Sequence, residues 1–332
     1  MAASFGTSDR FYSPAPTNTP NNRIYGFGAT SQGTIHTPGG PEACPGERSQ
    51  ISSKPIWQVL SENNIPWKIY ITDPEPTCGN FSPSCMARST YLQFFTWINA
   101  APGATGFNPE ALKHLAPLQC PKNGCPAGTT DYFTDVANGT LPAVAFVETG
   151  SFTGRDEHPS GKDLTQNPPF QSRIDIQIGA KYVSGIINAL MGTPSAPSAS
   201  WKDSVFIWAF DEGGGAFDHV PPMSVPNPDG ISPSICQAKD ANVGGDFNIS
   251  GFRIPMMVIS PFAKKNFVSH TPMDYTAILK LIETRWGLPP LTKRDAAMPD
   301  MTEFFDFANT PWAVPPDPPV QAHNTPCDFN QQ

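Results

Sequence analysis

The chain has 332 residues, with 21 lysines and arginines against 29 aspartates and glutamates, and its formal net charge is −8. A nucleic-acid-binding protein needs a basic face to neutralise phosphates, so this balance argues against a general nucleic-acid binder. The 39 prolines and 27 glycines predict long, punctuated loops around a scaffold rather than a helical bundle.

The first half of the chain is expected to consist mostly of loops. Residues 1–50 carry turn-forming residues almost throughout. A helix is expected to begin near Ser53 and to give way to a strand at residues 67–73, "WKIYITD". Residues 74–88 predict a loop that contains cysteines, and residues 89–98 predict a short helix.

The second half alternates between strands and helices. The expected order is a strand at 141–150, a helix at 172–194, a strand at 204–210, a loop at 221–250, a strand at 254–262 and a helix at 274–288. One face of the helix at 172–194 carries Ile174, Ile178, Tyr182, Ile186 and Leu190. This alternation predicts an α/β fold with a mostly parallel central sheet and helices on both faces. In such sheets, ligands bind beyond the carboxyl ends of the strands.

No internal repeat or dividing linker is visible, so a single domain over residues 1–332 is expected, with a proline-rich tail at 309–332. The sequence has no apolar run of the roughly 18 to 20 residues that would span a bilayer. The N-terminus has neither a charged region nor an apolar region of the kind that forms a secretory signal.

The seven cysteines stand at positions 44, 78, 85, 120, 125, 236 and 327. Cys78 with Cys85, and Cys120 with Cys125, are close enough in sequence to close small disulfide loops, as expected of an exported protein. Zinc binding is the competing interpretation of "CPKNGC" at 120–125. A secreted or periplasmic location is therefore expected, although no signal peptide is present in this chain.

The first polar cluster, "FDEGGGAFDH" at 210–219, directly follows an expected buried strand. The strand fixes the backbone of Asp211 and Glu212, while the glycines allow a sharp turn and a close approach to a ligand. Two adjacent carboxylates held in this way suit a divalent cation. His219 could be a ligand, a phosphate donor or a proton donor. The alternative is an ordinary turn with solvated side chains.

Two further polar clusters could contribute to a site. His158 lies in "DEHPSG" at 156–161, in the loop after the expected strand at 141–150, and "PTNTPNNR" at 16–23 supplies hydroxyls, amides and an arginine. Each cluster alone is typical of an ordinary loop. Together the three supply a nucleophile, an arginine, a carboxylate pair and two histidines, which suit transfer at phosphorus. Serine-hydrolase chemistry fits less well, because there is no G-x-S-x-G motif.

The chain resembles the phosphoesterase family of bacterial phospholipases C, their acid-phosphatase relatives and the plant non-specific phospholipases C. The blocks that carry the resemblance are "TPNNRIYGFGATSQG", "DEHPSG", "WAFDEGGGAFDHVPP", "FRIPMMVISPF" and "MDYTAILKLIETRWGL", in the family's order. The resemblance runs from residue 3 to about residue 313. It implies an alkaline-phosphatase-like fold and a metal-assisted mechanism with a covalent phospho-enzyme.

The resemblance assigns roles to individual residues. Thr19 matches the nucleophilic threonine, with Thr17 as a second candidate because the proline of this motif is shifted by one position. Four further roles follow from the family's motifs, namely phosphate binding by Asn22 and Arg23, metal binding by Asp211 and Glu212, leaving-group protonation by His158, and phosphate binding or orientation by His219. A divalent metal cation is the expected cofactor.

The chain departs from the family pattern at two places. Many relatives have Asp-His where this chain has Asp274 and Tyr275, so a histidine role there is in doubt. The family's E-N-R-S-F-D-H block, which completes its metal site, has no match, so an N-terminally truncated phosphoesterase is expected.

The expected function is metal-assisted hydrolysis of a phosphoric ester, most simply a phospholipase C-type phosphodiesterase with a phosphothreonine intermediate. The alternatives are an acid phosphatase acting on monoesters and a non-catalytic protein that binds a phosphorylated ligand. The expected partner is a phospholipid or a small phosphate ester, with transient contact to a membrane surface and no nucleic acid.

Overall fold

The computed structural model describes residues 1–99, 106–158, 176–236 and 245–318. The chain divides into two compact units, each assembled from stretches that are distant in sequence. Unit 1 consists of Met1–Trp67, Tyr91–Lys113 and Val205–Pro311, and unit 2 consists of Lys68–Thr90, His114–Ser204 and Trp312–Gln332. Each unit is described by itself below.

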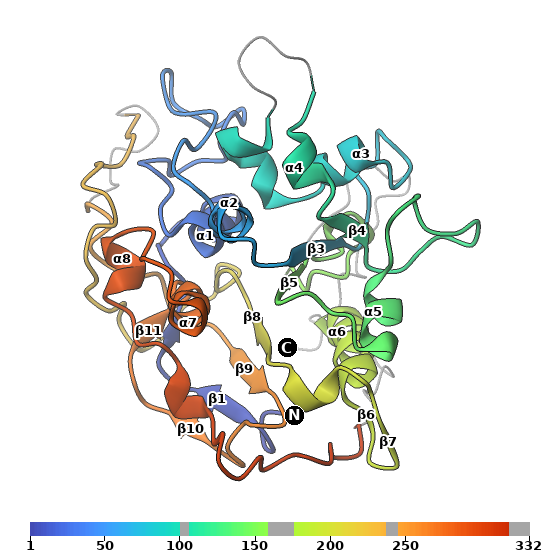
Figure 1. Cartoon of the computed structure of the whole chain (residues 1–332). Helices are drawn as coiled ribbons and strands as arrows, with labels where there is room; N and C mark the ends of the chain where they lie inside the picture. Colours follow the sequence, from blue (N-terminus) through green and yellow to red (C-terminus); the bar gives the residue numbers. More distant parts are fainter. Residues whose placement is uncertain (100–105, 159–175, 237–244, 319–332) are drawn as a thin grey trace, which may run out of the picture. The chain divides into compact units, whose positions relative to one another are not determined.

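A four-stranded sheet organises unit 1, with the strand order β10-β1-β9-β8 (Figure 1). The strands are β1 (Gly6–Ser8), β8 (Phe206–Ala209), β9 (Met256–Ile259) and β10 (Val268–Ser269). Strand β1 pairs with β10 in parallel and with β9 antiparallel, and β8 also pairs antiparallel with β9. The α/β class is confirmed, but this sheet mixes both directions rather than being mostly parallel, because β9 opposes both of its neighbours.

A second, two-stranded sheet of unit 1 pairs β2 (Phe11–Tyr12) in parallel with β11 (Met273–Asp274). Apolar side chains from both sheets, including Phe11, Met256, Val258 and Met273, form one core together with Phe304. The helices of unit 1 are α1 (Thr19–Gly28), α2 (Ile56–Glu62), α4 (Pro109–Leu112), α7 (Ala277–Trp286) and α8 (Lys293–Ala296). Its short 3₁₀ helices are η1 (Tyr91–Phe94), η2 (Thr96–Ile98) and η5 (Thr302–Phe304).

Helix α1 lies inside the opening region that was expected to be loop. It begins after Asn18, which is extended, has Pro20 in its first turn and ends at Ala29 in the left-handed conformation. Proline is tolerated in the first turn because the backbone N–H groups there have no partner within the helix. Its buried face includes polar residues, among them Asn21, so the apolar periodicity that predicts a helix is absent.

Unit 2 contains a three-stranded sheet with the order β4-β3-β5. Its strands are β3 (Trp67–Ile71), β4 (Leu115–Pro117) and β5 (Val144–Val147), and β3 pairs with β4 in parallel. Trp67, the first residue of β3, belongs to unit 1. A hairpin joins β6 (Gly192–Thr193) to β7 (Ala196–Pro197).

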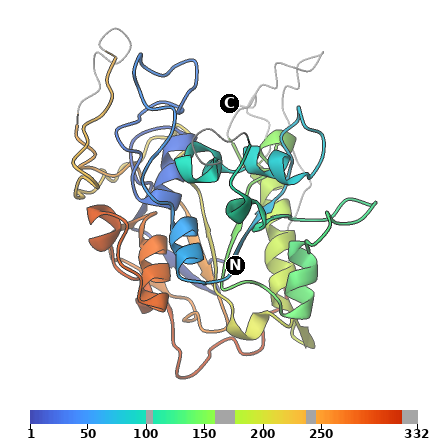
Figure 2. The same cartoon turned by 45° about the horizontal axis from the view of Figure 1, so that its top comes forward.

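The helices of unit 2 are α3 (Pro83–Arg88), α5 (Tyr132–Asn138) and α6 (Ile176–Met191), with the 3₁₀ helices η3 (Ser151–Thr153) and η4 (Trp201–Asp203). Helix α5 lies alongside α6 (Figures 1 and 2). Asp131 caps α5 by accepting a hydrogen bond from the Thr134 N–H at 2.8 Å. Asp135 accepts a hydrogen bond from the Tyr70 hydroxyl at 2.6 Å, which ties α5 to β3.

Most of the expected elements are confirmed with shorter bounds. The strands at 67–73, 141–150, 204–210 and 254–262 correspond to β3, β5, β8 and β9, and the helices after Ser53 and at 172–194 and 274–288 correspond to α2, α6 and α7. Residues 172–175 lie outside the described residues. The short helix expected at 89–98 corresponds to two 3₁₀ helices, η1 and η2.

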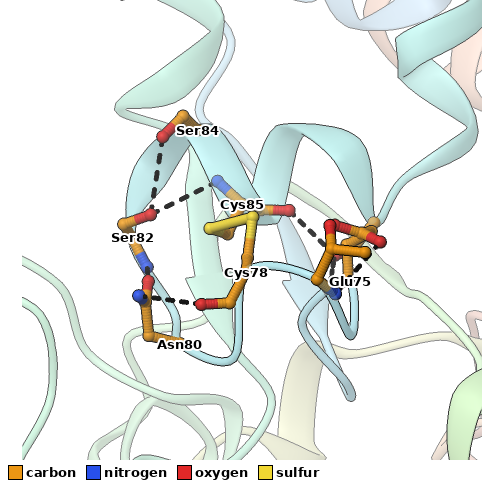
Figure 3. Close-up of a disulfide and its surroundings, with 8 residues drawn as sticks. Glu75, Cys78, Asn80, Ser82, Ser84 and Cys85 are labelled. Atoms are coloured by element: carbon orange, nitrogen blue, oxygen red, sulfur yellow. Dashed lines mark hydrogen bonds between the residues drawn. A yellow bond between two sulfur atoms is a disulfide. The ribbon is translucent and has the colours of Figure 1, made fainter.

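Three disulfides lie within the described part of the chain. Cys78–Cys85 and Cys120–Cys125 are the expected local loops, and Cys44–Cys236 joins residues 192 positions apart. Figure 3 shows Cys78–Cys85, where the Cys85 N–H donates to the Oγ of Ser82, the residue that caps α3. The disulfide at Cys120 and Cys125 contradicts the zinc alternative, because neither sulfur is a free thiolate. No helix in the described residues is long and apolar enough to cross a membrane.

Candidate functional site

The centre of the candidate site is a contact between the start of α1 and the end of β8. The Thr19 hydroxyl donates a hydrogen bond to Glu212 Oε1 at 2.7 Å. Thr19 is the first residue of α1, and Glu212 stands three residues after β8 ends, so two regular elements fix the backbone on both sides. Residues 193 positions apart in sequence are thereby brought into direct contact.

One helical turn further along, Arg23 pairs with the neighbouring carboxylate. Its Nε lies 3.2 Å from Asp211 Oδ2, and the exposed fractions of the two side chains are 10% and 13%. Residues four apart on a helix share a face, so Thr19 and Arg23 both face the end of β8. The Arg23 guanidinium also lies 5.4 Å from the ring centroid of Tyr91, a contact that nothing in the sequence indicated.

The structure places Asn22 differently from its neighbours. It is fully buried, its Oδ1 accepts from the Ala15 N–H at 3.1 Å, and its Nδ2 donates to the Thr17 carbonyl at 3.0 Å. These bonds brace the loop that leads into α1. Thr17, the second nucleophile candidate, donates its hydroxyl to the Ile35 carbonyl at 2.8 Å. Thr19, in contrast, donates its hydroxyl to an acidic side chain, Glu212.

His219 lies beyond the glycine turn, where Gly214 and Gly215 have φ values of 61° and 79°. This left-handed conformation favours glycine. The His219 side chain is 85% exposed, with Nδ1 3.6 Å from Asp218 Oδ1. Asp218 itself makes a two-point ion pair with Arg253, at 2.7 Å to Nε and 2.9 Å to Nη2. These hydrogen bonds from Arg253 lower the pKa of Asp218 well below its ordinary value.

His158 belongs to unit 2, whereas the other predicted site residues belong to unit 1. It is exposed, and its backbone N–H donates to Asp156 Oδ1 at 3.4 Å. The neighbouring Glu157 is 8% exposed and has a positive φ of 60°. Burial raises the pKa of Glu157 to about 7. A Cβ at Gly179 would lie 2.0 Å from Glu157 Cγ, so only glycine fits at that point of α6.

Asp211 and Glu212 offer the type of ligand that a hard divalent cation prefers. Two carboxylates and the Thr19 hydroxyl supply oxygen atoms held by β8 and α1. In the described residues, groups of three or more potential ligands occur at His36, Cys44 and Glu47 and at Cys120, Cys125 and Asp131, and both include disulfide-bonded cysteines. The carboxylates of Asp211 and Glu212 are thus ligands of the type that a divalent metal binds, and they would provide part of its coordination sphere.

Comparison with known proteins identifies a family. The family model described as the phosphoesterase family matches residues 1–289. Phospholipase C B of Mycobacterium tuberculosis is 27% identical over 323 residues, covering 94% of this chain and 54% of that protein. Non-specific phospholipase C1 of Arabidopsis thaliana is 26% identical over 338 residues, covering 94% of this chain and 50% of that protein. The chain thus spans about half the length of these relatives.

Among solved structures, a protein of the alkaline phosphatase superfamily from Vibrio parahaemolyticus is similar over 90% of this chain and 62% of its own, with a TM-score of 0.43 and 14% identity. The family match covers most of the chain, including α1, β8 and every predicted site residue. This chain therefore belongs to the phosphoesterase family.

Proposed function

We propose that the protein hydrolyses phosphoric esters, with Thr19 as the nucleophile and a phosphodiester such as a phospholipid as the substrate. The observation that carries this proposal is the 2.7 Å contact between the Thr19 hydroxyl and Glu212, beside the Arg23–Asp211 pair. Family membership and the names of the phospholipase C relatives support the reaction class.

Glu212 orients Thr19 for attack by accepting the hydrogen bond of its hydroxyl. The hydroxyl loses its proton to solvent as the Thr19 oxygen forms a bond to phosphorus, while the bond to the leaving alcohol breaks and its oxygen takes a proton from His158. In the second half-reaction, water gives a proton back to His158 as its oxygen displaces the threonine oxygen from phosphorus, and the threonine oxygen takes up a proton from solvent to regenerate the hydroxyl. Arg23 is proposed to stabilise the nonbridging oxygens, because a planar guanidinium suits phosphate.

The remaining roles extend this proposal. Asp211 and Glu212 would hold a divalent cation, which would lower the pKa of the Thr19 hydroxyl and neutralise phosphate oxygens. His158 is proposed as the proton donor to the leaving alcohol, with Asn22 and His219 as further phosphate ligands. The disulfides of the described residues support an oxidising location such as the periplasm or the exterior of the cell.

Substitution of the nucleophile tests the proposal. Thr19→Ala is expected to lower kcat on p-nitrophenyl phosphorylcholine by at least about 10³-fold, since no covalent intermediate can form. Thr19→Ser keeps a hydroxyl and should retain part of the activity. After an acid quench, fragment mass spectrometry of the wild type should find one phosphoryl group on Thr19.

Two results would contradict this assignment. Full activity in Thr19→Ala would exclude Thr19 as the nucleophile, and a phosphoryl group on Thr17 would move the role there. Parallel assays with p-nitrophenyl phosphate distinguish a monoesterase from a diesterase. Binding of both esters without turnover would favour the non-catalytic alternative.

A further inference from the structure

The loop formed by residues 34–47 packs directly against the segment that carries Thr19. Thr17 donates its hydroxyl to the Ile35 carbonyl at 2.8 Å, and Asn21 donates its side-chain amide to the His36 carbonyl at 3.0 Å. These two contacts lie on either side of Thr19 in the sequence. The 34–47 loop thus fixes the chain immediately before and after the proposed nucleophile.

Asn21 ties this interface together. It is fully buried, and its Oδ1 accepts a hydrogen bond from the Thr34 hydroxyl at 2.7 Å. Its Nδ2 also donates to Oδ1 of Asn18, the residue that precedes α1, at 2.9 Å. A buried amide whose oxygen and nitrogen are both bonded has one well-defined position, because any shift leaves a polar atom without a partner. The position of the start of α1 therefore depends on the position of the 34–47 loop.

The shape of the 34–47 loop depends in turn on one carboxylate, Glu47, whose side chain is fully buried. Its Oε1 accepts from the backbone N–H groups of Ile35 at 3.0 Å and His36 at 3.3 Å. Its Oε2 lies 2.9 Å from His36 Nδ1 and accepts from the Cys44 N–H at 2.8 Å. The Glu47 side chain thus binds residues near both ends of the 34–47 loop.

A covalent link holds the far end of the same loop. Cys44, whose N–H bonds to Glu47, forms the disulfide with Cys236. The other two disulfides of the described residues lie in unit 2 and close loops with sequence separations of 7 and 5. A continuous path of hydrogen bonds thus connects the Cys44–Cys236 disulfide to the Thr19 segment, through Glu47 and Ile35.

We infer that the Cys44–Cys236 disulfide and Glu47 act as positioning residues for Thr19, through the 34–47 loop. This inference rests on the proposed function for its catalytic consequence, but the positioning itself does not require turnover. The reason is geometric, since the hydrogen bonds from the loop end on Thr17 and Asn21, which flank Thr19. A displacement of a nucleophilic atom by about 1 Å can lower a reaction rate about 10²-fold.

The test compares removal of this disulfide with removal of a local one. The Cys44→Ser/Cys236→Ser variant is measured against Cys78→Ser/Cys85→Ser, at a temperature where circular dichroism shows both to be folded. Hydrogen exchange of the peptides that cover residues 13–28 should accelerate about ten-fold in the first variant, since local opening exposes these amides, and should be unchanged in the second. On p-nitrophenyl phosphorylcholine, kcat should fall by about ten-fold or more while KM changes less than about two-fold.

Glu47→Gln provides a second variant in which the disulfide stays intact. Gln keeps the size of the side chain but loses the charge and one accepting oxygen, so the same localised acceleration of exchange is expected, with a smaller fall in kcat. Glu47→Asp, which keeps the charge, should restore part of the protection.

The exchange and activity measurements separate the two hypotheses. Unchanged exchange over residues 13–28 in the Cys44→Ser/Cys236→Ser variant would overturn the positioning inference, whatever the activity. Equal acceleration across unit 1 would also overturn it, because the disulfide would then contribute only to global stability. If the wild type hydrolyses none of the esters, the proposed function fails, and a localised loss of protection would still support the positioning role.

Discussion

Two of the arginine–aspartate pairs in the described residues of unit 1 differ in their surroundings. Arg294 and Asp274 are fully buried, with Nη1 2.9 Å from Asp274 Oδ2. Arg23 and Asp211 keep 10% and 13% of their side chains exposed, at a distance of 3.2 Å. The same two residue types thus form one pair inside the core and another at the candidate site.

The buried pair joins distant parts of the backbone. Arg294 donates Nη1 to the Pro14 carbonyl at 2.9 Å and Nε to the Pro226 carbonyl at 2.8 Å, and its guanidinium lies 5.5 Å from the centroid of the Tyr25 ring. Its partner Asp274 accepts from both the N–H and the hydroxyl of Thr276, at 2.8 and 2.6 Å. Buried charges persist in proteins when hydrogen bonds satisfy them in this way.

The difference in burial predicts that one pair contributes to the stability of the fold and the other to the chemistry of the site. The polar contacts of Arg294 run to backbone carbonyls and Asp274, so the arginine at this position contributes to the fold. Arg23 is partly accessible and stands one helical turn from Thr19, so we propose that its guanidinium serves a phosphate. Three substitutions sharpen this distinction.

The largest expected effect is on stability, from Arg294→Met. Removing one partner leaves the buried Asp274 without its counter-charge, which should lower the free energy of unfolding by about 3–5 kcal/mol. Urea denaturation of Arg294→Met measures this loss. The double variant Arg294→Met/Asp274→Leu should recover part of it, and a loss below about 1 kcal/mol in the single variant would contradict the structural role.

An effect on activity rather than stability is expected from Arg23→Lys. Lysine keeps the charge but loses the planar fork that suits phosphate, so kcat/KM should fall about 10- to 100-fold, equivalent to about 1.4–2.7 kcal/mol. The free energy of unfolding should change by less than about 1 kcal/mol. Arg48→Lys, at an exposed arginine, is the matched control. A large loss of stability in Arg23→Lys would mean that both pairs are structural.

Expressed per pH unit, the smallest expected effect concerns Glu283, which lies beside the helix that carries Arg294. Glu283 is 1% exposed, and its Oε1 and Asp295 Oδ2 both accept from the Leu291 N–H. Burial, with the adjacent Asp295, raises the pKa of Glu283 to about 9. The folded protein therefore holds a proton that the unfolded chain releases above its ordinary pKa, so this contribution to stability falls as pH rises toward 9.

Glu283→Gln should remove this pH dependence, because glutamine is neutral at every pH. Relative to the wild type, the slope of the unfolding free energy between about pH 5 and pH 8 should become less negative by at most about 1.4 kcal/mol per pH unit. Urea midpoints at several pH values measure the slope. Parallel curves for the two proteins would show that Glu283 is ionised in the folded state.

The sequence predicted the elements whose burial follows a simple pattern. Strands such as β8 and β9 are continuous apolar runs, and α7 has helical periodicity, so their positions could be inferred. The antiparallel pairing of β8 with β9 could not, because the choice of neighbour depends on contacts across the whole unit. Helix α1 was missed because polar residues such as Asn21 and Asn22 are buried in its first half, so its buried positions do not form a regular apolar pattern.

For the candidate site, motifs predicted the residues but not how they combine. Thr19 and Arg23 lie one helical turn apart, and their partners Glu212 and Asp211 are adjacent, so the two contacts form side by side. This arrangement could not be inferred because the sequence predicted a loop where α1 lies. The Cys44–Cys236 disulfide could not be predicted, since residues 192 apart give no local signal of proximity. Family motifs also gave no indication that Asn22 braces a loop.

The pairing of β1 with β9 and β10 has a consequence for biosynthesis. Gly6 pairs with Val258, and Thr7 pairs with Val268, so the first strand has no partner until the chain has grown by about 250 residues. At ribosomal rates of about 5–20 residues per second, this delay is roughly 10–50 s. During that time the backbone groups of β1 lack a strand partner, so a nascent chain halted before β9 would expose an open strand edge that favours aggregation.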